Sequence, residues 1–98
     1  MRESQIEAYL VKRVKALGGE VRKVQWVGRR GAPDRLVMCP LLWHEGHACA
    51  HTAAVWVELK ATGVEPETHQ LREHKRMRAM GQRVVVIDSI EGVDALLA

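Results

Sequence analysis

Hydrophobic positions near the start of the chain recur every three or four residues. This spacing predicts an amphipathic helix over residues 4–17, followed by the pair Gly18-Gly19, which allows a left-handed stop. Ser4 and Glu7 have the spacing of a capping box, so we expect them to begin the helix. The apolar stripe of the helix consists of Ile6, Leu10, Val14 and Leu17.

Four later stretches either alternate polar and apolar residues or are continuously apolar, which predicts strands. They are residues 20–27, 34–39, 53–61 and 83–88. In the third stretch, AAVWVELKA, the period of two places Glu58 and Lys60 on one face beside Trp56. The opposite face of this strand carries Val55, Val57, Leu59 and Ala61.

Two further helices complete the pattern. The second begins near Pro66 and ends at Gly81, with one face formed by Gln70, His74 and Met77. The third runs to Leu97, and Asp88 with Glu91 has the spacing of a capping box at its start. The order α-β-β-β-α-β-α predicts an α/β fold in which helices flank a small central sheet.

Length and composition favour one small domain over residues 1–98 with an anionic partner. The formal net charge is +3, and 47% of the residues are hydrophobic. No apolar run approaches the roughly 20 residues of a membrane span, so we expect no membrane partner. The first ten residues lack the apolar core of a signal peptide, and two cysteines without a secretion signal predict reduced thiols in a cytoplasmic setting.

Two acids and a lysine carry the candidate chemistry. Asp34 follows Pro33 and opens a strand, while Glu58 and Lys60 lie on a strand expected beside it. Carboxylates that meet in space repel each other, and a divalent cation such as Mg²⁺ relieves that repulsion. A charged lysine cannot be a metal ligand, but it can orient a water molecule or stabilise charge on a phosphate. The alternative is a structural ion pair between Glu58 and Lys60.

At these residues the chain resembles the PD-(D/E)xK nucleases, through Pro33-Asp34 and Glu58-Leu59-Lys60. The longer run from GRRGAPDRLV to the last helix resembles the virus-type replication-repair nuclease domain, VRR-NUC, of the stand-alone phage and bacterial type. This resemblance implies a restriction-endonuclease-like mixed sheet. It also implies metal binding by Asp34, Glu58 and the Leu59 carbonyl, water activation by Lys60, and catalytic roles for Glu7 and Gln70.

The resemblance implies a Mg²⁺- or Mn²⁺-dependent DNA endonuclease that acts as a homodimer on branched DNA such as Holliday junctions. Its cleavage products would carry a 5′-phosphate and a 3′-hydroxyl. The enzyme would act in the cytoplasm of a bacterial cell or a phage-infected host. Glu7 would bind the metal directly or through water, with Glu3 as the other candidate on the same helix. The alternatives are a non-catalytic DNA-binding module of the same fold and a sequence-specific restriction-type nuclease.

Basic residues flank the Asp34 turn, where phosphate contacts would give salt-dependent affinity without sequence reading. The predicted DNA-binding residues are Arg22, Lys23, Arg29, Arg30 and Arg35. A weaker candidate set lies on the second helix and consists of Arg72, Lys75, Arg76 and Arg78.

The connection before the Glu58 strand contains five potential zinc ligands at a spacing that fits no standard zinc motif. These ligands are Cys39, His44, His47, Cys49 and His51. The simpler interpretation is a hairpin loop between the Asp34 strand and the Glu58 strand, with its histidines on a solvent-exposed or dimer-facing surface. We expect the dimer interface to involve residues 41–51 or the second helix, and the apolar side chains available for it are Trp26, Trp43, Trp56 and Met80.

Overall fold

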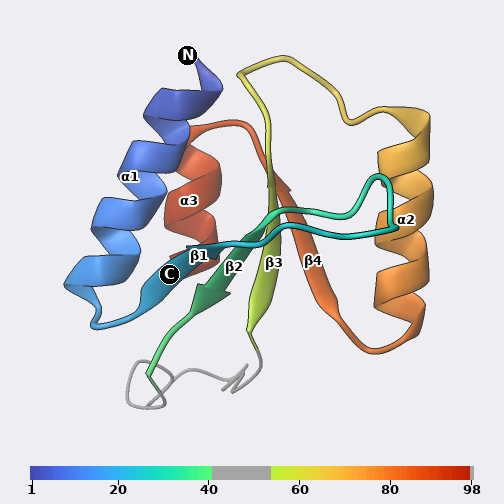
Figure 1. The fold of residues 1–98 in the computed structure, drawn as a ribbon. Helices are drawn as coiled ribbons and strands as arrows, with labels where there is room; N and C mark the ends of the chain where they lie inside the picture. Colours follow the sequence, from blue (N-terminus) through green and yellow to red (C-terminus); the bar gives the residue numbers. More distant parts are fainter. Residues whose placement is uncertain (41–53, 98) are drawn as a thin grey trace.

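The computed structural model describes residues 1–40 and 54–97, in which helices flank a mixed sheet (Figure 1). The elements follow the predicted order and are α1 (Glu3–Ala16), β1 (Glu20–Lys23), β2 (Arg35–Met38), β3 (Val55–Leu59), α2 (Thr68–Ala79), β4 (Arg83–Ile87) and α3 (Ile90–Leu97). The predicted α/β fold class is therefore confirmed. In the described ranges, every helix is too short or too polar to cross a membrane.

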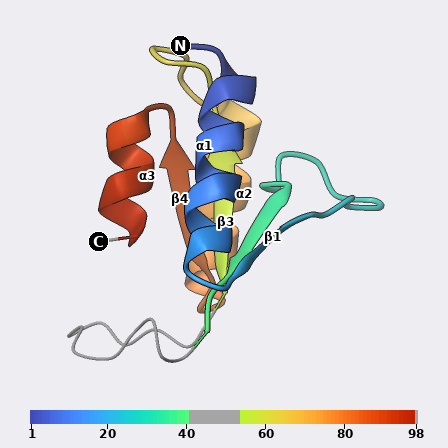
Figure 2. The ribbon, with the colours of Figure 1, turned by 90° about the vertical axis from the view of Figure 1, so that its left-hand side faces the viewer.

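The sheet has the strand order β1-β2-β3-β4. The first two pairings are antiparallel, and β3 pairs with β4 in parallel. A parallel pair needs a crossover connection, and α2 provides it. Figures 1 and 2 show α1 and α3 together on one side of the sheet and α2 on the other. The two faces of β3 therefore meet different helices.

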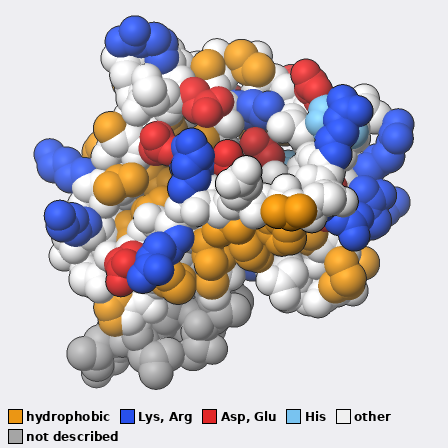
Figure 3. All heavy atoms as spheres, in the orientation of Figure 1, with side chains coloured by type: hydrophobic (Ala, Val, Ile, Leu, Met, Phe, Trp, Pro, Cys, Tyr) orange, Lys and Arg blue, Asp and Glu red, His pale blue; other side chains and the backbone are white. Residues whose placement is uncertain are grey.

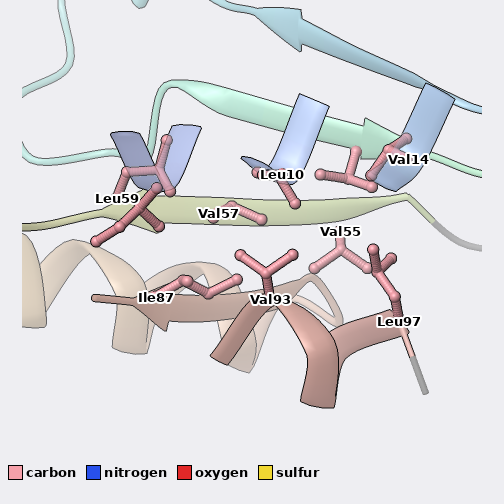
Figure 4. Packing of buried hydrophobic residues seen from close by; sticks show 10 residues of the cluster. Leu10, Val14, Val55, Val57, Leu59, Ile87, Val93 and Leu97 are labelled. Carbon is pink, nitrogen blue, oxygen red and sulfur yellow. The ribbon is translucent and has the colours of Figure 1, made fainter. Parts of the chain in front are cut away.

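The hydrophobic core lies between the sheet and the helix pair α1 and α3 (Figure 4). Val55, Val57 and Leu59 point into it from β3, as the alternation predicts. From α1 it receives Ile6, Leu10 and Val14, each fully buried. Full burial of such a side chain contributes about 1.5–3 kcal/mol, so this stripe is what holds α1 on the sheet.

Both predicted capping boxes are wrong. Helix α1 begins one residue earlier than expected, and the Gln5 side chain accepts a hydrogen bond from the Arg2 backbone N–H over 2.8 Å. Helix α3 begins after Ser89, whose hydroxyl accepts the Gly92 N–H over 2.9 Å. In each case a nearby polar side chain accepts a hydrogen bond from one N–H group at the helix start.

The first strand is shorter than predicted, because β1 ends at Lys23 instead of residue 27. Residues 24–34 form a loop that runs across to α2 (Figure 1). Gly31 has a φ of +87°, and a Cβ atom built there would lie 2.8 Å from the backbone oxygen of His69 at the start of α2. The loop therefore packs closely on α2, and only glycine fits at this contact.

This contact predicts unequal effects of alanine at two glycines of the loop. Gly28 also has a positive φ, +73°, but nothing lies within 4 Å of its added Cβ. We expect Gly28→Ala to lower the free energy of unfolding by about 1 kcal/mol, the cost of the left-handed backbone alone. Gly31→Ala should cost about 3 kcal/mol because it also displaces the loop from α2. Urea denaturation measures both, and equal losses would show that the loop does not pack on α2.

Candidate active site

The start of β2 and the end of β3 bring two predicted ligands together. Arg35 lies opposite Val57 in the antiparallel pair. One step further, the same register places Asp34 opposite Glu58, and opposite residues of a sheet point to the same face. The negative charge of Asp34 accordingly raises the pKa of Glu58. The two carboxylates thus share the sheet face that α2 partly covers.

Glu58 is a buried acid, with 8% of its surface exposed. Its Oε1 lies 3.2 Å from Nε2 of His74 on α2. Burial raises the pKa of Glu58 to about 7; the Lys60 ammonium opposes this shift, and the charges of Asp34 and Glu3 add to it. The site therefore holds a carboxyl group whose negative charge is poorly compensated by the protein itself.

His74 is the residue of the site that the sequence did not single out. Its side chain is fully buried, and burial together with Arg78 lowers its pKa. A neutral imidazole protonated on Nε2 donates to Glu58 and leaves Nδ1 as an acceptor; within the described residues this Nδ1 has no hydrogen-bond partner. His74 thus orients the carboxylate. The available signal was its place on the helix face shared with Gln70 and Met77.

Arg35 lies between two predicted site acids. Its guanidinium forms an ion pair with Glu7 of α1, and its Nη1 lies 2.8 Å from Oδ1 of Asp34. The Arg35 side chain is 11% exposed. Of the two acids on α1, Glu7 thus forms an ion pair with Arg35, while the negative charge of Glu3 raises the pKa of Glu58. A DNA phosphate could reach Arg35 only in competition with these carboxylates.

The Leu59 carbonyl faces a position without a donor. The Lys60 N–H donates to the Ile87 carbonyl of β4 over 3.0 Å. Because backbone groups alternate direction along a strand, those of Leu59 point toward β2. There the register places Pro33, which has no N–H. The Leu59 carbonyl therefore lacks its regular partner in the sheet, next to the two carboxylates.

The donor set suits a hard divalent cation. Across residues 1–40 and 54–97, no three His, Cys, Asp or Glu side chains cluster closely enough to hold a metal alone. Asp34, Glu58 and the Leu59 carbonyl would supply three oxygens. Mg²⁺ commonly takes one or two carboxylates and keeps several waters, so this small oxygen set fits it.

Lys60 and Gln70 occupy different surroundings. Lys60 is half-buried just after β3, and no ion pair joins it to Glu58 in the part of the chain that is described. The structural ion pair considered as an alternative is thus not formed. The Gln70 side chain accepts the Glu67 N–H over 2.8 Å at the start of α2. Gln70 therefore caps the helix, and its role at the site stays a prediction.

The predicted DNA-binding residues divide by their partners. Arg22 pairs with Glu20 on the surface, and Arg29 lies 3.4 Å from Glu73 of α2. Arg30 is exposed and has no ion pair with any described residue. Figure 3 shows acidic and basic side chains gathered between α1 and α2, with further basic side chains along α2. The site thus lies on a face of mixed charge flanked by cations.

Of the five potential zinc ligands, only Cys39 lies in the described ranges. It is half-buried, and burial raises the pKa of its thiol. The other four, His44, His47, Cys49 and His51, lie within residues 41–53, outside the described residues. Trp43, one of the apolar candidates for an interface, also lies there.

The mixed sheet has the element order predicted for a restriction-endonuclease-like fold, and Asp34, Glu58 and Lys60 lie where the resemblance to PD-(D/E)xK nucleases predicts the site. The chain is 43% identical over 89 residues to "Putative nuclease p44" of Acyrthosiphon pisum secondary endosymbiont phage 1, covering 91% of this chain and 85% of that protein. A solved structure described as "VRR_NUC domain" matches with a TM-score of 0.78 and 40% identity, covering 97% of this chain and 92% of that one. No family model matches. The chain belongs to the VRR-NUC family, as the sequence predicted.

The position of Arg35 predicts a loss of stability when its charge is removed. Arg35→Met should lower the free energy of unfolding by about 1–2 kcal/mol, because Glu7 and Asp34 lose a partner while retaining some access to water. The matched control is Arg22→Met, which breaks an exposed pair and should change the free energy by less than about 0.5 kcal/mol. Chemical denaturation at neutral pH compares the two, and equal effects would contradict the bridging role of Arg35.

Proposed function

We propose that the chain is a divalent-metal-dependent DNA endonuclease. The observation that carries this proposal is the meeting of Asp34 with the buried Glu58, whose pKa is raised to about 7. A divalent cation would stabilise both carboxylates in their charged form. The name of the phage relative and the description of the matching solved structure both support nuclease activity.

In the proposed mechanism, Asp34, Glu58 and the Leu59 carbonyl would hold Mg²⁺ or Mn²⁺. The bound metal would polarise the scissile phosphate and lower the pKa of the attacking water. His74 holds the Glu58 carboxylate in one orientation, which is the usual task of a residue behind a metal ligand. Lys60 orients the water or stabilises the charge that develops on the phosphate. Hydrolysis leaves a 5′-phosphate and a 3′-hydroxyl.

We further propose branched DNA, such as a four-way junction, as the substrate and a homodimer as the active species. Resolving a junction requires two symmetric nicks, and a C₂ dimer supplies two related sites. Exposed apolar side chains such as Met80, which is 70% exposed, could serve an interface of this kind. Comparing linear duplex, single strand, flap, splayed arm and junction in a cleavage assay separates this substrate class from that of a restriction-type nuclease.

Catalysis should depend on the two carboxylates and Lys60. With Mg²⁺ or Mn²⁺, Asp34→Asn, Glu58→Gln and Lys60→Ala should each lose at least about 100-fold in cleavage rate, because each removes a metal ligand or the group beside the water. DNA binding measured in EDTA should persist. The matched control is Glu91→Gln on α3, an exposed acid on the other side of the sheet, which should cleave at the parent rate.

Two outcomes of this assay count against the proposal. If purified Glu58→Gln protein cleaves as fast as the parent, the site is misassigned. If the parent binds every substrate but cleaves none with either metal, the chain is a non-catalytic DNA-binding module of the same fold.

Affinity for DNA should come mainly from phosphate contacts. Arg30→Ala should weaken all DNA substrates alike, reduce the salt slope of binding by about one unit, and leave stability unchanged. Arg29→Ala should also reduce the slope by about one unit, and should in addition release the contact with Glu73. Fluorescence anisotropy at several salt concentrations in EDTA measures the slope, with Lys12→Ala on α1 as control. A loss confined to one DNA sequence would indicate base reading instead.

A further inference from the structure

An open pocket of about 640 Å³ lies at the loop between β1 and β2. Its volume is in the range of small-ligand sites. The lining includes Lys23, Gln25, Trp26, Arg29 and Asp34. Because Asp34 is a proposed metal ligand, a group that fills this pocket lies beside the phosphate that would be cleaved. The proposed function uses Asp34 as a metal ligand and Arg29 for phosphate contact, but gives Gln25 and Trp26 no role.

The aromatic wall of the pocket is held in a fixed orientation. The Trp26 indole N–H donates to the Pro33 carbonyl over 2.8 Å. Its ring packs against Trp56, with 5.1 Å between ring centroids and a tilt of 48°. The Trp56 indole N–H in turn donates a hydrogen bond to Oε1 of Gln82 over 3.1 Å. A ring held in this way loses little conformational entropy when a ligand stacks on it.

The polar part of the lining is complementary to an anion. Lys23 and Arg29 contribute two positive charges against the one negative charge of Asp34, and the Arg29 side chain, whose Nη1 also lies 3.4 Å from Oε1 of Glu73, is 51% exposed. Gln25 adds an amide that can both donate and accept hydrogen bonds. A flat aromatic surface beside cations and an amide suits a nucleotide, because the base can stack on the ring, the phosphate can approach the cations, and the polar edge of the base can form hydrogen bonds with the amide.

We propose that this pocket binds one unpaired nucleotide next to the scissile phosphate, with its base stacked on Trp26. This inference rests on the proposed nuclease function. A base can reach the ring only when it has left the stack of a duplex, so the pocket favours DNA with an unpaired nucleotide at the cleavage site. Trp26 is bonded to Pro33, the residue before Asp34, and stacking therefore also holds the strand against the metal ligands.

The test measures whether the contributions of Trp26 and of one base to DNA-binding affinity depend on each other. Binding of a short single strand is measured by fluorescence anisotropy in EDTA, for the intact strand and for versions with one abasic residue at each position in turn. We expect one position at which base removal weakens binding to the parent protein on the order of tenfold. Trp26→Leu should lose a similar factor and become insensitive to the abasic residue at that position, as a double-mutant cycle requires.

Two matched variants separate stacking from folding. Trp26→Phe keeps an aromatic ring but loses the N–H, and should retain most of the affinity and the dependence on the base. Val27→Ala changes a neighbour that is 93% exposed and does not line the pocket, and should bind like the parent. If Trp26→Leu fails to fold, the abasic series on the parent and the Trp26→Phe variant still decide.

The inference is overturned if the effect of Trp26→Leu on binding and the effect of removing a base are independent of each other. Binding that is indifferent to every abasic position, or Trp26→Leu and abasic losses that simply multiply, would exclude stacking in the pocket. Cleavage of the linear duplex, single-strand, flap, splayed-arm and junction substrates with Mg²⁺ separates the two proposals. Cleavage without coupling would overturn the pocket alone, whereas coupling without cleavage would overturn the nuclease proposal and support the pocket as a nucleotide site.

Discussion

A carboxylate buried on a central strand must be compensated, and the architecture of the site follows from how this chain treats Glu58. The protein places a neutral imidazole against it and keeps the cations Lys60 and Arg35 near but unbonded to it. Asp34, directly before the neighbouring strand β2, makes the charged form still less favourable. Compensation therefore stays incomplete, which costs stability in the free protein and is the reason for proposing a divalent cation at this site.

The alternation of side chains along β3 places the site residue Glu58 and the core residues on opposite faces of the strand. On β3, Val57 and Leu59 face the helix pair α1 and α3, while Glu58 faces α2. The same alternation directs the Leu59 carbonyl toward Pro33, the one residue type with no N–H to offer. One short strand thus contributes side chains to the hydrophobic core, and its Glu58 carboxylate and Leu59 carbonyl are two oxygen groups that could bind a metal.

Hydrophobic period was sufficient for the order of the elements and for the two faces of β3, but not for the helix caps or for the end of β1. Alternation in AAVWVELKA predicted which face of β3 carries Glu58, and the order of elements predicted the fold class. Features that depend on tertiary contact were not accessible. The spacing of the second helix places His74 on its inward face but does not say which strand residue it meets. Arg35 belonged to a run of basic residues, and such a run does not distinguish a buried bridge between carboxylates from a cation that binds phosphate.

The end of β1 shows how one contact overrides a local pattern. Residues 20–27 alternate as a strand should, yet regular pairing stops at Lys23, and Trp26 bonds to Pro33 across the loop. Gly31 against His69 and Arg29 against Glu73 then fasten the loop to α2. The chain segment that ends at Asp34 is therefore attached to the helix that carries His74, the partner of Glu58. The distance between the two carboxylates is thus controlled by the sheet register and also by the packing of this loop, which joins residues far apart in the sequence to the geometry of the site.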